Sequence, residues 1–187
     1  MTNTMVKTMK KNRLSVKAQT LATLATIVAA VAIPQLFHVV GAISGMDTSI
    51  GETFLPMHLP IILVGLLAGP YAGAVAGLLA PIASFALSGM PSVVMLPIMI
   101  VELCVYGLSS GLLRTVKMPT VGKVLIAQVA GRAVRAIAIL VAIFAFGNEI
   151  INISAIWMSI AIGLPGIILQ LVLLPLITFR VDNMKKN

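Results

Sequence analysis

The chain has 187 residues, of which 59% are hydrophobic and only 10% are charged, and its formal net charge is +8. Soluble domains average about half apolar and about a quarter charged residues, so this composition excludes an ordinary soluble domain and indicates an integral membrane protein. Positive charge is also typical of nucleic-acid binding, but here the basic residues lie at the ends of hydrophobic runs. We therefore expect a lipid bilayer around the chain and no nucleic-acid partner.

In chain order, the hydrophobic runs predict an all-α protein with six transmembrane helices. A basic tail, residues 1–16, comes first, a single membrane domain covers 17–180, and a second tail follows at 181–187. The apolar stretch 54–90 is too long for one span, so we expect a turn at Gly69-Pro70 between a short helix and a longer one. The expected spans are 17–41, 56–67, a third that follows Gly69-Pro70 and ends before an outer turn at 88–92, then 93–113, 121–146 and 153–179.

The basic residues predict how these spans are oriented. Of the 13 Lys and Arg, all but Arg132 and Arg135 lie near the N-terminus, around the connection between spans four and five, or at the C-terminus. The connections that contain Asp47, Glu52 and Glu149 carry no basic residue. Because cytoplasmic loops are enriched in Lys and Arg, we expect an even number of spans and both termini in the cytoplasm.

Small residues recur at helical spacing on the first and third spans. In lipid, such stripes allow two helices to approach closely. On the third span, packing within this chain is the favoured interpretation. On the first span, internal packing and docking of another membrane protein both stay open. The two stripes are Ala18, Ala22, Ala25, Ala29 and Ala32, and Gly69, Gly73, Gly77, Ala80, Ser84 and Ser88.

Three ionisable residues are expected at depth in the membrane, Glu102 on span four and Arg132 and Arg135 on span five. A charge there costs at least about 2.5 kcal/mol, so such residues face a partner or a wet cavity. The two arginines share a helix face, and Glu102 is expected at a similar depth. A structural ion pair is one interpretation. Because one positive charge is left over, a ligand carboxylate or phosphate is the other.

The outer ends of the spans hold further candidate ligand-binding residues. His58, beside Met57, is expected to line a cavity near the outer loop, and Asn152 and Trp157 open the last span on the same side. For Trp157 an interfacial anchor is favoured over ligand stacking, and for His38 a solvated position is favoured over the cavity. One histidine with two loop acids is too little to predict a metal site.

Missing motifs narrow the function further. The chain has no phosphate-binding loop of the Walker type, no H-E-x-x-H and no G-x-S-x-G, so we expect neither ATP hydrolysis nor a catalytic centre, and no cofactor. The lone Cys104 excludes an internal disulfide. A self-sufficient carrier or channel stays open as one function, although no inverted repeat is visible. An intramembrane enzyme ranks third.

The chain resembles the S components, the substrate-binding subunits, of energy-coupling factor (ECF) vitamin transporters. The likeness covers nearly the whole chain and extends to the branch assigned to pantothenate. It rests on the alanine spacing of the first helix and on the series Phe54-Leu55-Pro56-Met57-His58-Leu59-Pro60-Ile61, Ala68-Gly69-Pro70-Tyr71-Ala72-Gly73 and Ser88-Gly89-Met90-Pro91.

This resemblance implies a mechanism and a set of partners. A ligand site near the outer face would be capped by residues 42–55, and the alanine face (Ala18, Ala22, Ala25 and Ala29) would dock a transmembrane coupling subunit. Two ABC-type ATPases would drive that subunit, and the S component would tilt in a prokaryotic plasma membrane to deliver its ligand. Pantothenate fits the spare positive charge best, while pyridoxine, a cobalamin precursor or another small metabolite stay open because the fold does not set the ligand.

Overall fold

The computed structural model describes residues 14–45 and 53–184, and within these ranges the chain is helical with no strand. The predicted tail up to residue 13 and the loop acids Asp47 and Glu52 lie outside the described residues. A short 3-10 turn, η1 (Leu113–Thr115), follows α5. The α-helices are α1 (Val16–Ser44), α3 (His58–Ala68), α4 (Pro70–Ser88), α5 (Leu96–Leu112), α6 (Thr120–Phe144), α7 (Ala155–Ile162) and α8 (Leu164–Met184).

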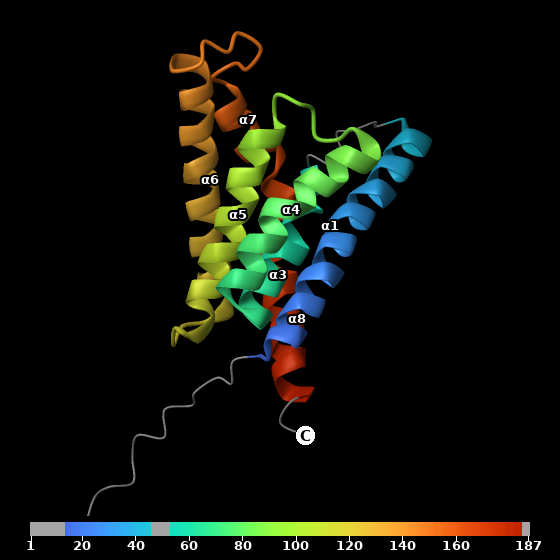
Figure 1. Ribbon diagram of the computed structural model, residues 1–187, viewed down its shortest axis with the longest axis vertical. Coiled ribbons are helices and arrows are strands. Elements are labelled where there is room, and N and C mark those ends of the chain that lie inside the picture. Colours follow the sequence, from blue (N-terminus) through green and yellow to red (C-terminus); the bar gives the residue numbers. More distant parts are fainter. Residues whose placement is uncertain (1–13, 46–52, 185–187) are drawn as a thin grey trace, which may run out of the picture.

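Five of these helices, α1, α4, α5, α6 and α8, are long and apolar enough to cross a membrane. The predicted short second helix is α3, with 11 residues, and the predicted turn is present, because Gly69 has φ 114° and Pro70 begins α4. A left-handed φ of this kind favours glycine, and proline suits the first turn of a helix. Figure 1 shows that α1 begins and α8 ends at the same end of the bundle.

The predicted last span over 153–179 is not a single helix. The structure divides this segment into α7 and α8, which meet at Gly163. Pro165 lies in the first turn of α8 and has no N–H to donate to the preceding helical turn. Hydropathy cannot reveal this break, because both helices are strongly apolar.

Glycines bring α3, α4 and α5 into close contact. A Cβ atom at Gly73 would collide with the backbone of Gly107, and one at Gly77 would collide with the backbone of Leu103. A Cβ at Gly65 would likewise meet Ser110. The small-residue stripe of α4 therefore packs against α5 within this chain, as the favoured interpretation of the sequence predicted.

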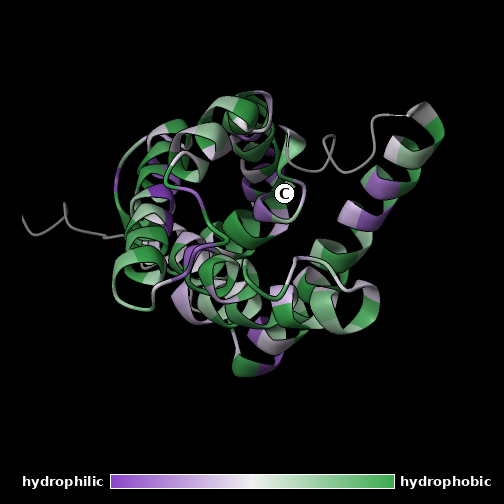
Figure 2. Ribbon diagram, turned by 90° about the horizontal axis from the view of Figure 1, so that it is seen from above, coloured by the Kyte–Doolittle hydropathy of each residue, from purple (hydrophilic) through white to green (hydrophobic). Residues whose placement is uncertain are grey.

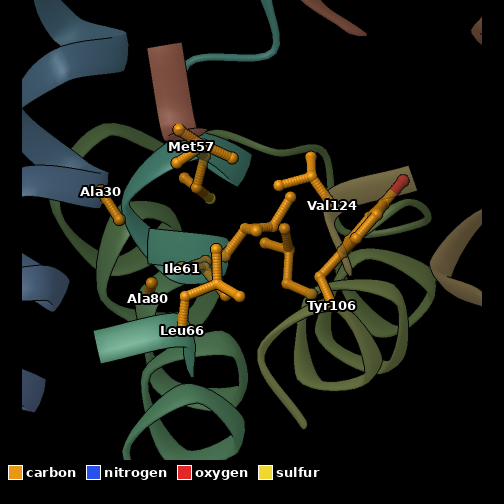
Figure 3. Close-up of a cluster of buried hydrophobic side chains, with 10 residues drawn as sticks. Ala30, Met57, Ile61, Leu66, Ala80, Tyr106 and Val124 are labelled. Atoms are coloured by element: carbon orange, nitrogen blue, oxygen red, sulfur yellow. The ribbon is translucent and has the colours of Figure 1, made fainter. Parts of the chain in front are cut away.

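The hydrophobic core lies between α3 and its neighbours. Figure 3 shows Ile61 and Leu66 of α3 among Tyr106 of α5, Val124 of α6 and Ala30 of α1, all of them buried. Hydrophobic residues also cover most of the outer surface of the helices (Figure 2). Apolar surface on all sides is what a lipid-facing bundle requires.

We call the end of the bundle at which α3 and α5 begin the upper end, and the end at which α1 begins the lower end, as they lie in Figure 1. The helix α1 packs against α3 and α4 through a face that contains Thr23, Thr26, Ala30 and Pro34. The opposite face of α1 is exposed, and its upper part leans away from α5 and α6 in Figure 1.

Candidate ligand-binding site

A cavity of about 490 Å³ lies at the upper end of the bundle. Its walls come from α1, from the segment that leads into α3, from the 90–95 connection before α5, and from α6 and α7. Pockets for small ligands commonly measure about 300–1,000 Å³. The cavity is therefore large enough for a vitamin-sized molecule.

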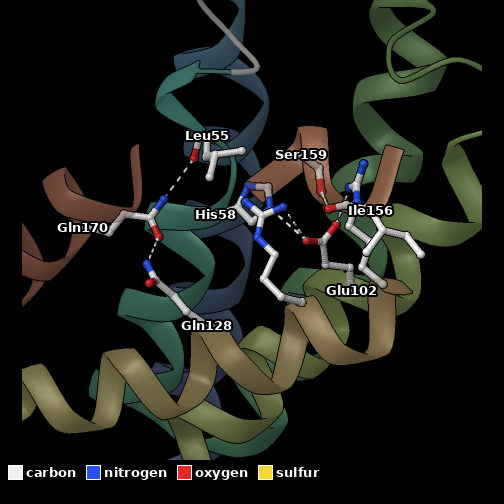
Figure 4. Close-up of polar contacts among 9 residues, drawn as sticks. Leu55, His58, Glu102, Gln128, Ile156, Ser159 and Gln170 are labelled. Carbon is white, nitrogen blue, oxygen red and sulfur yellow. Dashed lines mark hydrogen bonds and ion pairs between the residues drawn. The ribbon is translucent and has the colours of Figure 1, made fainter. Parts of the chain in front are cut away.

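Glu102 is the centre of a buried charge cluster beside this cavity (Figure 4). Arg135 Nη1 donates a hydrogen bond of 2.7 Å to Glu102 Oε2. Arg132 Nη1 lies 3.5 Å and His58 Nε2 lies 3.7 Å from Glu102 Oε1. Glu102 is 0% exposed and His58 is 4% exposed, so solvent screens these charges weakly.

Close packing of α5 against α6 makes this cluster possible. A Cβ atom at Gly131 would lie 2.7 Å from the Tyr106 ring, so glycine is needed where that ring meets α6. The next turn of α6 carries Arg132 and Arg135, which are three residues apart and share a face toward Glu102. Tyr106 also makes an edge-on contact with His58, with ring centroids 5.1 Å apart.

Several polar atoms of the cluster are buried without a hydrogen-bond partner among the described residues. They include Nε and Nη2 of Arg132, Nε of Arg135 and both ring nitrogens of His58. An unmet buried donor costs about 1–3 kcal/mol, and more when it is charged. Because both arginines and His58 also line the cavity, a ligand with hydrogen-bonding atoms could pair with these groups.

The rest of the cavity wall is largely apolar and rich in methionine. These side chains bend and polarise easily, so they adapt to the shape of an apolar ligand. Together with the arginines they give the cavity a cationic side and an apolar side. The methionines are Met57, Met90, Met95, Met99 and Met158.

The charge of the site favours an anion over a metal cation. His58 and Glu102 are neighbours, but no group of three or more potential His, Cys, Asp or Glu ligands is found among the described residues. Two guanidinium groups beside one carboxylate leave a positive charge in a poorly solvated place. Such a charge repels a cation and attracts a carboxylate or phosphate.

The structure brings most of the predicted site residues together. Met57, His58, Arg132 and Arg135 line the cavity, and Glu102 lies buried next to them. His38 also lines the cavity, although the sequence favoured a merely solvated position for it.

Asn152 and Trp157 do not line this cavity. Asn152 Oδ1 accepts a hydrogen bond from the backbone N–H of Ser154 before α7, and Trp157 is 74% exposed. The ligand contacts expected of both residues stay predictions. The exposure of Trp157 is consistent with the interfacial anchor that the sequence favoured.

The alanine stripe of α1 lies at the border between its buried and exposed faces. Ala22 packs against a cluster of α3 and α4 that includes Val64 and Ala72. Ala25 is exposed, while Ala18 and Ala29 are half-buried. The stripe is therefore neither wholly packed within this chain nor wholly exposed.

A pair of buried glutamines was missed by the sequence reading. Gln128 Nε2 of α6 donates to Gln170 Oε1 of α8 at 3.0 Å, and Gln170 Nε2 donates to the carbonyl oxygen of Leu55 at 3.3 Å (Figure 4). A single amide within an apolar span is a signal for such a contact, because an unpaired amide is costly in lipid.

Comparison with known families gives a match that covers most of the chain. The family model described as ECF transporter, substrate-specific component, matches residues 13–178. A search of curated proteins and a search of solved structures found no match. The matched region contains all the cavity-lining residues described above.

Proposed function

This chain belongs to the family of substrate-specific components of ECF transporters, and on that premise we propose that it binds a small anionic vitamin, best matched by pantothenate, in the cavity at its upper end. It is a multi-pass membrane protein and a transporter subunit rather than an enzyme. The choice of ligand rests chiefly on one observation, the unpartnered donors of Arg132 at the cavity wall.

The two arginines have different roles in this proposal. Arg135 is neutralised by Glu102, to which it is hydrogen-bonded at 2.7 Å. Arg132 is 3.5 Å from the same carboxylate, and its Nε and Nη2 are buried without a hydrogen-bond partner. These two atoms lie on one edge of the guanidinium plane, where a carboxylate is held by two parallel hydrogen bonds. Arg132 is therefore the proposed seat of the ligand carboxylate.

The chemistry of pantothenate fits both sides of the cavity. Its carboxylate suits Arg132, and its paired methyl groups suit the wall formed by Met57, Met95 and Met99. Pyridoxine has no carboxylate to place beside the arginines. Among small vitamins, the cavity therefore favours those that combine one negative charge with apolar groups.

The proposed arrangement in the membrane follows from charge. Six spans within a single domain, 17–180, would have α3 as the short second span and α7–α8 as the sixth. Lys17, Lys117 and Arg180 belong to segments at the lower end, where α1 begins and α8 ends. By the positive-inside rule this end faces the cytoplasm, so the cavity faces outward and both termini are cytoplasmic.

Release of the ligand is proposed to need other proteins. The exposed edge of the α1 stripe, with Ala25, offers a small-residue surface for a transmembrane coupling subunit. Two ABC-type ATPases would supply the energy that this chain, without a phosphate-binding loop, does not.

Isothermal titration of the purified chain with a vitamin panel tests the ligand proposal. We expect pantothenate to bind below the micromolar range without ATP, and pantothenol, its neutral alcohol analogue, to bind more weakly. Native mass spectrometry of protein purified from rich medium identifies any co-purified ligand. If no vitamin or precursor binds below the micromolar range, the binding proposal fails.

A further inference from the structure

The turn that leads into α3 adopts an unfavourable backbone conformation at the cavity wall. Leu55 has φ 48°, and it is the non-glycine residue with positive φ in the part of the chain that the structure describes. Left-handed conformations of this kind cost about 1–3 kcal/mol and persist only where surrounding contacts hold them. Leu55, Pro56, Met57 and His58 all line the cavity. Whatever holds Leu55 therefore also holds one wall of the cavity.

Two hydrogen bonds reach the carbonyl oxygen of Leu55. The backbone N–H of His58 donates at 3.1 Å, which starts the first turn of α3, and Gln170 Nε2 of α8 donates at 3.3 Å. The Gln170 amide is in turn oriented by Gln128 Nε2 at 3.0 Å. Gln170 is 1% exposed and Gln128 is 4% exposed, and neither lines the cavity.

The same face of α8 is shaped to receive this turn. A Cβ atom at Gly166 would lie 2.6 Å from the carbonyl carbon and oxygen of Phe54. A Cβ at Gly163 would lie 3.0 Å from both the Leu55 side chain and Arg132 Nη2. One helical turn beyond Gly166, Gln170 adds a polar side chain that donates to the turn. Gly166 and the Gln170 amide of α8 thus lie against the backbone of 53–55, and Gly163, just before α8, lies against the Leu55 side chain.

We propose that Gln170, supported by Gln128, is a positioning residue of the ligand site, because it holds Leu55 in its left-handed conformation and so fixes Met57 and His58 at the cavity wall. The pair also joins three parts of the site. Gln128 lies one turn before Arg132 on α6, Gln170 lies on α8, and Leu55 leads into α3. The claim that the cavity is the ligand site rests on the proposed function. The claim that Gln170 holds Leu55 in its conformation does not rest on it.

Hydrogen–deuterium exchange of the ligand-free protein tests whether Gln170 holds Leu55 in its conformation. We expect Gln170→Met to speed exchange of the 53–59 amides by about tenfold, the value of one buried hydrogen bond. Thr178→Val is the matched control, because Thr178 is also buried on α8 but donates only to carbonyls of its own helix. It should leave the 53–59 amides unchanged. Exchange that rises equally in both variants, or evenly over the chain, overturns the proposal.

Replacement of Leu55 distinguishes a backbone conformation that Gln170 holds from one that the packing of the Leu55 side chain holds. Leu55→Gly and Leu55→Ala both remove the side chain, but only glycine adopts φ 48° freely. In the Gln170→Met background, Leu55→Gly should slow exchange of the 53–59 amides by about threefold or more relative to Leu55→Ala. Equal exchange in the two double variants shows that Gln170 does not hold the backbone turn and overturns the proposal.

If Gln170→Met does not fold, Gln128→Met replaces it in the exchange experiment. It keeps the Gln170 to Leu55 contact but removes the group that orients it, so we expect a smaller rise, about threefold, at the same amides. No rise at 53–59 overturns the supporting role of Gln128.

Ligand kinetics complete the test. Pantothenate should dissociate about tenfold faster from Gln170→Met than from Thr178→Val. An unchanged dissociation rate overturns the positioning role even where exchange has risen. If pantothenate does not bind the unmodified protein, the ligand proposal has failed, whereas the exchange results still decide whether Gln170 holds Leu55.

Discussion

The two ends of the bundle satisfy buried polar groups in different ways. At the lower end, Ser110 and Thr178 donate to carbonyls of their own helices, and the backbones of α3, α4 and α5 meet through glycines. At the upper end, polar side chains contact residues of other elements, as Arg135 does with Glu102 and Gln170 with Leu55. Hydrogen bonds within single helices let the lower end pack tightly, whereas contacts between elements position polar groups beside the cavity at the upper end.

The same helices contribute residues to both ends of the bundle. On α5, Glu102 faces the charge cluster while Gly107, five residues later, lies against the backbone of Gly73. On α3, His58 lines the cavity and Gly65 packs against Ser110. A rigid lower end therefore fixes the positions of the binding groups above it. Substitutions at the two ends should therefore have different effects on stability and on ligand binding.

The largest effect is expected from Glu102→Gln at the upper end. This change leaves two buried guanidinium groups without their carboxylate, which costs about 3–5 kcal/mol of unfolding free energy. Denaturation in mixed micelles, followed by circular dichroism, measures the loss. Glu149→Gln, at an exposed position, is the control and should stay within about 0.5 kcal/mol.

The double variant Glu102→Gln with Arg135→Gln should recover part of that stability, because it removes one stranded charge as well. Pantothenate affinity should fall far less in Glu102→Gln than in an Arg132 variant. Unchanged stability of Glu102→Gln would show that the cluster is solvated rather than buried.

The next largest effect is expected on ligand affinity and not on the stability of the fold. Arg132→Gln should weaken pantothenate binding by about ten- to a hundredfold, the value of a charge-assisted contact of about 1.5–3 kcal/mol. Pantothenol should be affected far less, because it has no carboxylate. Titration with both compounds measures the difference. Arg180→Gln, exposed at the lower end, is the control. Equal weakening of both compounds would assign Arg132 a structural role.

A methyl group added at the lower end tests its close packing. Gly107→Ala should lower the unfolding free energy by about 1–3 kcal/mol, because the new Cβ meets the Gly73 backbone, which has no side chain to move aside. Gly122→Ala on α6 is the matched control, since its Cβ would lie 3.3 Å from the mobile end of Met118. That variant should be neutral or more stable by up to about 1 kcal/mol. Comparable losses in both variants would argue against close packing.

The smallest effect on the fold is expected on α1. Ala25→Leu should change stability by less than about 0.5 kcal/mol, because Ala25 is exposed. It should nevertheless abolish pantothenate uptake by cells that contain the coupling subunit and both ATPases, while titration shows unchanged binding. Ala22→Leu should in addition lower stability by about 1–3 kcal/mol, since Ala22 packs on α3 and α4. Normal uptake by Ala25→Leu would place the docking surface elsewhere.

Much of the site was predictable because it is made of residues that are unusual in an apolar segment. Glu102, Arg132 and Arg135 stand out, since a charge at depth needs a partner or a cavity. Apart from Met57, which adjoins His58, the methionines that line the cavity do not stand out, because methionine is common in any apolar helix. The positions of Asn152 and Trp157 depend on the break between α7 and α8, which hydropathy does not show.

The sequence alone determined that the chain is helical, where most spans begin and end, and that a turn lies at Gly69-Pro70, because hydropathy and the backbone preferences of glycine and proline act locally. Only the tertiary structure decided which helices meet through glycines, that His58 joins Glu102, and that Gln170 reaches Leu55, 115 residues away along the chain. These contacts depend on the rotation and depth of one helix against another. Those are set by the packing of whole surfaces, which no single segment encodes.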